Sequence, residues 1–324
     1  MINTIILDGK LNREFALEKS IESLLSGNPI AFPTETVYGL GTPIFYENGI
    51  HKIYEIKQRN IKNPLSAHIG NLSDVEHICS YIPDKFYKLA EKFLPGPLAI
   101  VLKKKKNIIN SLSEDTDSIG IRYPDNDIFL SLVRKLGQPI LATSANLSGR
   151  PSPNNAISVY EDLNGKIEII LDGGNCKYSI ESTVLSLATD KPLLIRPGVI
   201  EQREIEELLG EKVYSLNQSI IMPNQEYYGT KIKSMPYRTF ITEDIEKLKN
   251  FLGINNKNRI LLFLSEESFT KIDWEYKLIL KTETFFENLR YAEKNNFENV
   301  IFLFDKFVKN IELIKHRLRD SETL

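Results

Sequence analysis

Short apolar runs of strand length recur through the first two hundred residues, and helical patterns separate them. Each run is bounded by turn-forming or polar residues, which is the pattern expected of buried strands. The predicted strands are Thr4–Leu7, Ile30–Phe32, Leu65–Ile69, Leu98–Leu102, Ser118–Arg122, Ile140–Thr143, Ile167–Leu171, Thr183–Leu187 and Leu193–Arg196. The predicted helices cover residues 48–58, 73–80, 84–93, 126–136, 153–162 and 201–209, and a further one begins after Asn12 with Phe15, Leu17, Ile21, Leu24 and Leu25 on its apolar face. This alternation predicts an α/β domain over residues 1–210, built around one large mixed sheet.

The pattern changes after residue 210. Residues 211–240 show no sustained period and contain Gly, Pro, Asn and Ser, which predicts a linker lying on a surface. Strands are then predicted at Arg259–Leu264, Leu278–Lys281 and Asn299–Phe304, with helices at residues 243–252, 283–295 and 306–319. We therefore expect a small Rossmann-like α/β domain over residues 241–324.

Composition excludes several classes of protein. Apolar residues make up 42% of the chain and charged residues 26%, as in ordinary globular proteins, and the net charge is only −2. An overall basic nucleic-acid-binding domain is therefore not expected, and the "KKKK" run at 103–106 is interpreted first as a solvated turn. Two cysteines do not make a disulfide scaffold, and no signal peptide or membrane span is predicted, so we expect a cytoplasmic protein.

The stretch "FPTETVYGLG", residues 32–41, ends an apolar run with hydroxyls and then turns to glycine. Glycines after a strand let a ligand or another backbone approach closely. The stretch is neither GxGxxG nor a Walker loop, so by itself it does not establish phosphate binding. Taken alone, a tight strand-to-loop turn is an equally good interpretation.

Cations and hydroxyls follow several other predicted strands and helices. Lys57 and Arg59 suit a polyphosphate or a carboxylate, although lysine and arginine at a helix end also complement the helix dipole. Arg122 closes an apolar strand, where an arginine pairs with a carboxylate of the protein or of a ligand. "ESTVL" and "IRPG" place Ser182 and Arg196 beside strands in the same way.

The stretch "ATSANLSGRPSP", residues 142–153, is the richest in hydroxyls, amides and free backbone N–H groups. Ser152-Pro153 is predicted to cap a helix, whose N-terminus favours anions. The four histidines and two cysteines show no metal-ligand spacing, and no GxSxG motif is present. These clusters predict a shared crevice that positions reactants and neutralises anions, without a covalent nucleophile.

In this order, "FPTETVYGLG", the Lys57 and Arg59 pair before "NPLSAHI", "PGPLAIVL", "GIRYP", "ATSANLSGRPSP", "ESTV" and "IRPG" closely resemble the YrdC-like threonylcarbamoyl-AMP synthases. The resemblance spans residues 10–200, and "FFENLRYAEKNNFENVIFL" is similar to a segment of the two-domain branch of that family. It implies a YrdC-like twisted mixed sheet followed by the small C-terminal domain, with the linker folding over the active site. In the linker, "SMPYRTF" keeps Met235, Tyr237 and Arg238 but lacks the Pro-Gly and the His of the family pattern.

The resemblance implies synthesis of L-threonylcarbamoyl-AMP from L-threonine, bicarbonate and ATP, with Mg²⁺ accompanying the nucleotide. A tRNA-threonylcarbamoyl transferase would then take the product, for modification of the adenosine next to the anticodon. The residues implied for L-threonine are Thr34, His68, Arg122, Ala142 and Ser182. Those implied for ATP are Lys57, Arg59, Ser118, Ser144, Asn146, Ser152, Arg196 and Tyr237. Thr34 would offer its hydroxyl to the amino acid, and the glycines of "FPTETVYGLG" would let the loop fold closely over the site.

Two alternatives stay open at this point. An RNA-binding or ribosome-associated protein could use the same concave surface without turnover, with a weak RNA contact, although the balanced charge is unfavourable for it. A carbamoyl-adenylate step inside a larger maturation enzyme is the other, but the zinc-finger and acylphosphatase-like regions of such proteins have no counterpart here.

Overall fold

The computed structural model describes residues 2–109, 117–215, 235–255, 259–308, 311–318 and 321–324. The chain divides into two compact units. Unit 1 comprises residues 1–148 and 152–229, and unit 2 comprises residues 149–151 and 230–324. Most of the expected linker, residues 216–234, lies outside the described residues, so a linker over 211–240 that folds over the active site stays a prediction.

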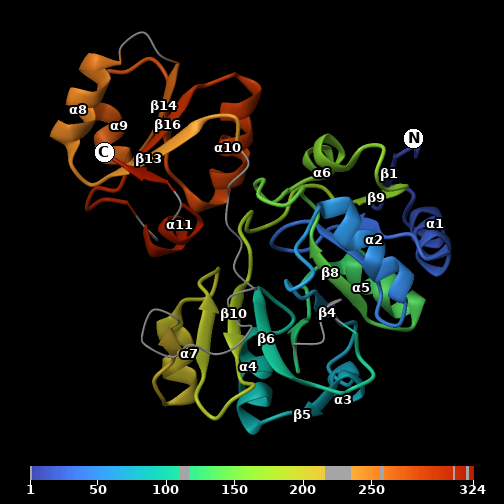
Figure 1. The fold of residues 1–324 in the computed structure, drawn as a ribbon. Helices are drawn as coiled ribbons and strands as arrows, with labels where there is room; N and C mark the ends of the chain where they lie inside the picture. The colour runs from blue at the N-terminus through green and yellow to red at the C-terminus, as the bar shows by residue number, and fades with distance from the viewer. Residues whose placement is uncertain (1, 110–116, 216–234, 256–258, 309–310, 319–320) are drawn as a thin grey trace. The chain divides into compact units, whose positions relative to one another are not determined.

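The described part of unit 1 is built on one mixed sheet (Figure 1). In spatial order its strands are β1 (Ile5–Asp8), β9 (Ile169–Asp172), β2 (Ile30–Phe32), β3 (Gly39–Pro43), β8 (Ile140–Ser144), β4 (Ser66–His68), β7 (Ser118–Arg122), β6 (Leu98–Lys104), β10 (Thr183–Ser186), β11 (Leu193–Arg196) and β12 (Tyr214–Ser215). A short strand, β5 (Cys79–Tyr81), pairs with β6 off this path. The sheet contains parallel pairs, such as β4 with β7, and antiparallel pairs, such as β6 with β7, which confirms the predicted mixed sheet.

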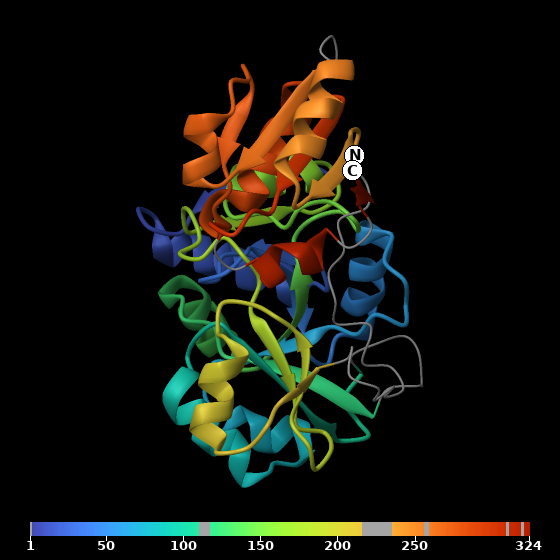
Figure 2. The same cartoon turned by 90° about the vertical axis from the view of Figure 1, so that its left-hand side faces the viewer.

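Helices cover the two faces of this sheet unequally. One face packs against α2 (Glu47–Lys57), α3 (Asp74–Ile78), α4 (Asp84–Phe93), α6 (Ala156–Leu163) and α7 (Gln202–Leu209) in a large apolar core. Of these, α4 and α7 lie side by side (Figures 1 and 2). The opposite face packs against α1 (Arg13–Leu25) and α5 (Asp127–Leu136) in a smaller core, formed with strands β9, β2 and β8. Successive side chains of a strand point to opposite faces of the sheet. On β2, Ile30 and Phe32 therefore enter the smaller core, and Ala31 enters the larger one.

Strand β3 corrects one prediction. Gly39 and Gly41 were expected in a loop that folds over the site, but they lie within β3, which is antiparallel to both β2 and β8. A Cβ at Gly39 would stand 2.7 Å from a ring carbon of Phe32, and one at Gly41 would stand 2.5 Å from Ile140 Cγ2. The glycines are therefore needed because large side chains of the neighbouring strands cross over them.

Two helix predictions are also wrong in detail. The helix expected to begin at Ser152-Pro153 begins at Ala156, and the side chain of Asn155 caps it by accepting from the Ser158 N–H. On α1, Phe15 and Leu25 were expected on the apolar face but are about half exposed. Small residues take their place in the core, because Ala16 and Ser20 are fully buried there.

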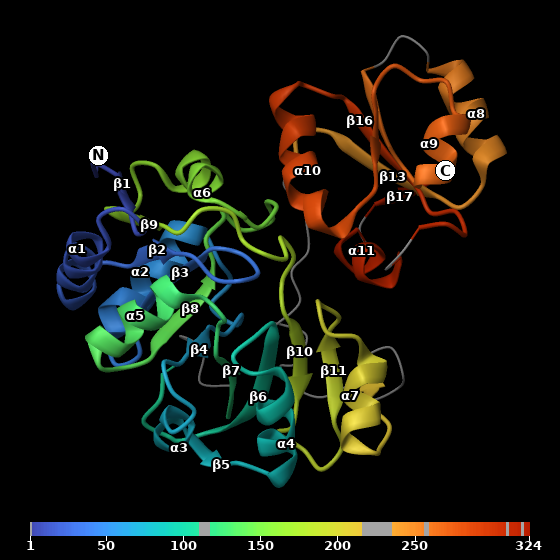
Figure 3. The same cartoon turned by 180° about the vertical axis from the view of Figure 1, so that it is seen from behind.

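The described part of unit 2 is a smaller, fully parallel sheet with helices (Figure 3). The strand order is β15 (Lys277–Ile279), β14 (Ile260–Leu264), β16 (Asn299–Leu303), β13 (Arg238–Thr242) and β17 (Glu322–Thr323). Its helices are α8 (Ile245–Ile254), α9 (Glu266–Lys271), the short 3₁₀ helix η2 (Thr282–Thr284), α10 (Phe285–Lys294) and α11 (Ile311–Arg317). The sequence pattern predicted a Rossmann-like α/β domain here but missed β13, α9 and β17.

We expect Gly41→Ala to lower the free energy of unfolding of unit 1 by about 1–3 kcal/mol, because the added methyl must displace Ile140 or the Leu141 carbonyl in a packed sheet. Thermal and denaturant unfolding measure the change. Gly253→Ala on α8 is the control of opposite sign, since a Cβ there meets no atom within 4 Å and alanine favours a helix by up to about 1 kcal/mol. Equal effects of the two substitutions would contradict the packing argument.

Candidate functional site

A single face of the unit 1 sheet carries several of the residues expected to bind substrate. Paired residues on neighbouring strands present their side chains to the same face. Ile140 on β8 pairs with His68 on β4, His68 pairs with Arg122 on β7, and Arg122 pairs with Ala99 on β6. Ile140 lies in the core beneath α1 and α5, so His68 and Arg122 continue the same face beyond that core.

Other expected residues share this face by the two-residue repeat of the strands. Ala142 and Ser144 follow Ile140 on β8 at intervals of two, and Ser118 stands four residues before Arg122 on β7. Four residues of strand correspond to roughly 13 Å. The expected threonine residues His68 and Arg122 therefore stand at one end of the strands, and the expected nucleotide residues Ser118 and Ser144 stand toward the other.

The segment between β2 and β3 reaches across the sheet to Arg122. Glu35 Oε1 lies 2.7 Å from an Nη of Arg122, and the Thr36 hydroxyl lies 3.5 Å from both Nη atoms. Glu35 is 2% exposed and Arg122 is 6% exposed. Arg122 was expected to meet a carboxylate of the protein or of a ligand, and in this structure Glu35 of the protein supplies one.

The Glu35–Arg122 pair is incompletely satisfied. Among the described residues, Glu35 Oε2 and Arg122 Nε are buried without a hydrogen-bond partner. Burial raises the pKa of Glu35, while the positive charge of Arg122 opposes that rise. A buried ion pair is stable when hydrogen bonds satisfy its remaining polar atoms, so these two atoms suit a ligand with an acceptor for the arginine and a donor for the glutamate.

His68 is held neutral beside Arg122. Its Nδ1 lies 3.1 Å from the Ser66 carbonyl, and because a carbonyl only accepts, Nδ1 carries the proton. Phe32 and Phe129 approach the imidazole ring edge to face. Burial, and to a smaller extent the charge of Arg122, lowers the pKa of His68 to about 3. The imidazole therefore offers a neutral Nε2 lone pair beside the guanidinium.

Lys57, the last residue of α2, organises the turn after β8. Its ammonium donates to the carbonyls of Ser144 and Asn146, and the side chain is buried. Burial lowers the pKa of Lys57 well below its usual range, and the neighbouring charge of Arg59 adds to this. Arg59 donates to the carbonyls of Asn63 and Pro64, so both expected cations help to shape the loops around the ends of β8 and β4.

Ser152, Ser182 and Arg196 form a second polar group. The Ser152 hydroxyl donates to Glu181 at 2.8 Å, and the Arg196 guanidinium donates to the Ser182 carbonyl at 2.9 Å. Ser182 directly precedes β10, two residues before Val184, which pairs with Arg196. The expected binding role of Ser152 therefore rests on its side chain, because it does not begin a helix.

The hydroxyls of two expected residues, Thr34 and Tyr237, donate to backbone carbonyls of the protein. The Thr34 hydroxyl donates to the Val37 carbonyl at 2.6 Å and accepts from the Thr36 and Val37 N–H groups, so it folds the segment that carries Glu35. Tyr237 belongs to unit 2, where its hydroxyl donates to the Leu289 carbonyl. A contact of either residue with a ligand stays a prediction.

Three buried polar residues of this group, Glu35, Thr36 and Glu181, were not singled out from the sequence. A signal was present, because Glu35 and Glu181 each lie among small hydroxyl residues next to an apolar strand, where a charge needs a partner. Within the described ranges, no three His, Cys, Asp or Glu side chains are grouped so that they could hold a metal ion. In the same ranges, no helix has the length and apolar character needed to span a membrane.

Comparison with known proteins places residues 22–198 in a family. A sequence profile named for Sua5, YciO and YrdC, and described as "Telomere recombination", matches residues 22–198, more than half of the chain. Threonylcarbamoyl-AMP synthase of Pyrococcus abyssi is 43% identical over 185 residues, which are 57% of this chain and 54% of the relative. Threonylcarbamoyl-AMP synthase of Bacillus subtilis is 41% identical over 204 residues, 61% of this chain and 59% of the relative. The aligned part thus spans between half and three fifths of these two relatives.

A solved structure extends the likeness to both units. The crystal structure of P. abyssi Sua5 complexed with L-threonine matches with a TM-score of 0.85 at 27% identity, covering 99% of this chain and 100% of that one. The match confirms the twisted mixed sheet and the small second α/β domain as the fold that the sequence predicted.

We expect His68 to make the protein less stable in acid. Between pH 6.5 and 3 the unfolded imidazole binds a proton that the folded one does not, so its contribution to stability is complete above pH 6.5 and is lost as the pH falls. From pH 7 to pH 5 this loss is about 2 kcal/mol, and His68→Gln should remove it. Urea unfolding at the two pH values measures the difference. His51→Gln, at an exposed position of α2, is the control, and an unchanged pH dependence in His68→Gln would contradict the assignment.

Proposed function

The chain belongs to the Sua5/YciO/YrdC family, and on that premise we propose that it synthesises L-threonylcarbamoyl-AMP from L-threonine, bicarbonate and ATP, with release of pyrophosphate. The observation that carries the proposal is the buried polar face of the unit 1 sheet, where Arg122 stands beside neutral His68 with Nε unpartnered among the described residues. A guanidinium in that state suits the carboxylate of an amino acid. The relative solved with L-threonine supports the same substrate.

The nucleotide would occupy the other end of the same strands. Lys57 fixes the turn after β8 through the Ser144 and Asn146 carbonyls, and Ser118 stands at the start of β7 on the same face. Arg59, Ser152 and Arg196 add charge and hydroxyl donors for the phosphates. The roughly 13 Å between Ser118 and Arg122 would leave room for an amino acid and a triphosphate to meet between them.

The chemistry needs positioning more than acid or base groups. The threonine amine attacks bicarbonate, water leaves, and a carbamate forms. A carbamate oxygen then attacks the α-phosphorus of ATP, and pyrophosphate departs with the electrons of the broken P–O bond. Holding two anions in line against their repulsion is the main task, for which fixed cations and dipoles are suited. Mg²⁺ would travel with the triphosphate oxygens, since the described residues form no acidic cluster for it.

The product would be used by another protein. A mixed carbamic–phosphoric anhydride is labile, so we propose that a tRNA-threonylcarbamoyl transferase takes it and modifies the adenosine next to the anticodon. The relatives' name, threonylcarbamoyl-AMP synthase, supports this placement. A cytoplasmic location, where tRNA and ATP are available, is part of the proposal.

Pyrophosphate release tests the reaction. We expect the full chain to release pyrophosphate from ATP only when both L-threonine and bicarbonate are present, and L-serine serves as the control amino acid. Release that is indifferent to threonine would contradict the proposed synthesis. In that case binding of tRNA by the same face becomes the experiment to do next.

We expect Arg122→Ala to raise the threonine concentration needed for half-maximal release on the order of 30- to 4,000-fold, equivalent to about 2–5 kcal/mol, because it removes the partner of the substrate carboxylate and leaves Glu35 buried and unpaired. The requirement for ATP should change much less, as Arg122 stands at the opposite end of β7 from Ser118. Steady-state titration of each substrate separates the two effects. An equal increase in the half-maximal concentrations of threonine and ATP would show that Arg122 does not bind the amino acid selectively.

A further inference from the structure

The two unpartnered atoms of the Glu35–Arg122 pair have opposite character. Arg122 Nε is a donor and Glu35 Oε2 is an acceptor, and both are buried without a hydrogen-bond partner in the described parts of the chain. A purely structural arginine–glutamate pair commonly satisfies itself through two parallel hydrogen bonds. Here one short contact of 2.7 Å joins the pair, and the Thr36 hydroxyl at 3.5 Å adds little.

An α-amino acid presents the complementary pair of groups. By standard bond lengths, its ammonium nitrogen and its carboxylate carbon are about 2.5 Å apart. The two side chains that would meet these groups also lie close together, since Glu35 Oε1 is 2.7 Å from an Nη atom of Arg122. A zwitterion can therefore set its carboxylate against the guanidinium and its ammonium against the Glu35 carboxylate at the same time.

Resting on the proposed function, we propose that Glu35 binds the ammonium of the amino-acid substrate through Oε2 and thereby makes the site select a free α-amine. Glu35 and Arg122 then bind the zwitterionic amino acid together, with each charge of the substrate next to the opposite charge of the protein. Their contact with each other holds both side chains in place before the substrate arrives.

The surroundings of Glu35 favour this role. Burial raises the pKa of Glu35, the nearby charge of Asp125 adds to the rise, and the charge of Arg122 opposes it. A second positive group next to this carboxylate would therefore be favourable. His68, next to Arg122 in the sheet, is neutral and does not supply that charge. The Thr34 hydroxyl braces the segment through three backbone contacts, so Glu35 has little freedom to turn away.

A cycle of protein and ligand changes tests the proposal. Isothermal titration measures the affinities of the full chain for L-threonine and for (R)-3-hydroxybutyrate, which keeps the carboxylate and hydroxyl but lacks the amine. We expect the wild type to prefer threonine strongly, and Glu35→Gln to reduce that preference by on the order of tenfold or more, mainly through weaker threonine binding.

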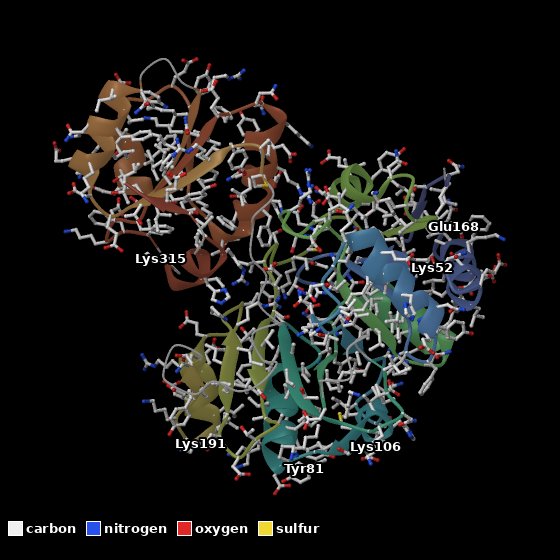
Figure 4. The ribbon with its side chains drawn as sticks, viewed as in Figure 1. Lys52, Tyr81, Lys106, Glu168, Lys191 and Lys315 are labelled. Atoms are coloured by element: carbon white, nitrogen blue, oxygen red, sulfur yellow. The ribbon has the colours of Figure 1, made fainter. Side chains whose placement is uncertain are left out.

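The matched control is Glu168→Gln. Glu168 accepts from Ser23 and Asn28, and it lies beside α1, far along the sheet from Arg122 (Figure 4). This variant should keep the wild-type preference within threefold. Glu35→Asp, which keeps the charge on a shorter side chain, should keep more of the preference than Glu35→Gln, and it serves if the glutamine variant does not fold.

The outcomes separate this inference from the proposed function. If threonine supports pyrophosphate release but Glu35→Gln keeps the full preference for the amine, Glu35 does not bind the ammonium and the inference alone fails. The inference also fails if the wild type binds the two ligands within threefold of each other. If pyrophosphate release does not depend on threonine and neither ligand binds, both the proposed function and this inference are contradicted.

Discussion

The ion pair between Glu35 and Arg122 joins two segments that are 87 residues apart in the sequence. It ties the segment after β2 across the sheet to the end of β7, over the strands that lie between them. Removing one partner of such a buried pair costs on the order of 3–5 kcal/mol, because the other charge stays in a medium that solvates it poorly. Thr34 folds the segment that carries Glu35, the Thr36 hydroxyl lies 3.5 Å from the guanidinium, and His68 pairs with Arg122 in the sheet.

Unequal cover of the sheet explains why a polar site can exist inside unit 1. Helices α1 and α5 bury one face over β9, β2 and β8, and the same face continues over β4 and β7 with His68 and Arg122. The opposite face is covered by the larger apolar core, which holds the strands in register. A rigid sheet with polar residues on part of one face holds fixed charges without the reorganisation that a flexible surface would need.

Local pattern predicted the elements well where side chains are large and apolar. Strands β2, β7 and β11 have the predicted bounds, because Ile, Leu and Phe mark a buried strand. Strand β3 was missed because Gly39 and Gly41 contribute no hydrophobic signal and are explained only by Phe32 and Ile140 crossing over them. The cap at Ser152 was wrong because its hydroxyl is engaged by Glu181, a partner that local sequence does not reveal.

The candidate site was predictable only in part. The expected residues of β4, β7 and β8 share one face, as a common crevice requires, and the resemblance to a family supplied their roles. Glu35 lies within the "PTET" motif, but its ion pair with Arg122 is a long-range contact that the periodicity of the sequence does not reveal. Burial is what makes a carboxylate informative, and burial is known only from the fold.

A crystal structure of the full chain with L-threonine tests the role of the Glu35–Arg122 pair most directly. We expect the amino acid on the polar face of the unit 1 sheet, with its carboxylate against Arg122 and its ammonium against Glu35 Oε2. An amino acid bound elsewhere, with Oε2 of Glu35 and Nε of Arg122 still without ligand contacts, would contradict this role.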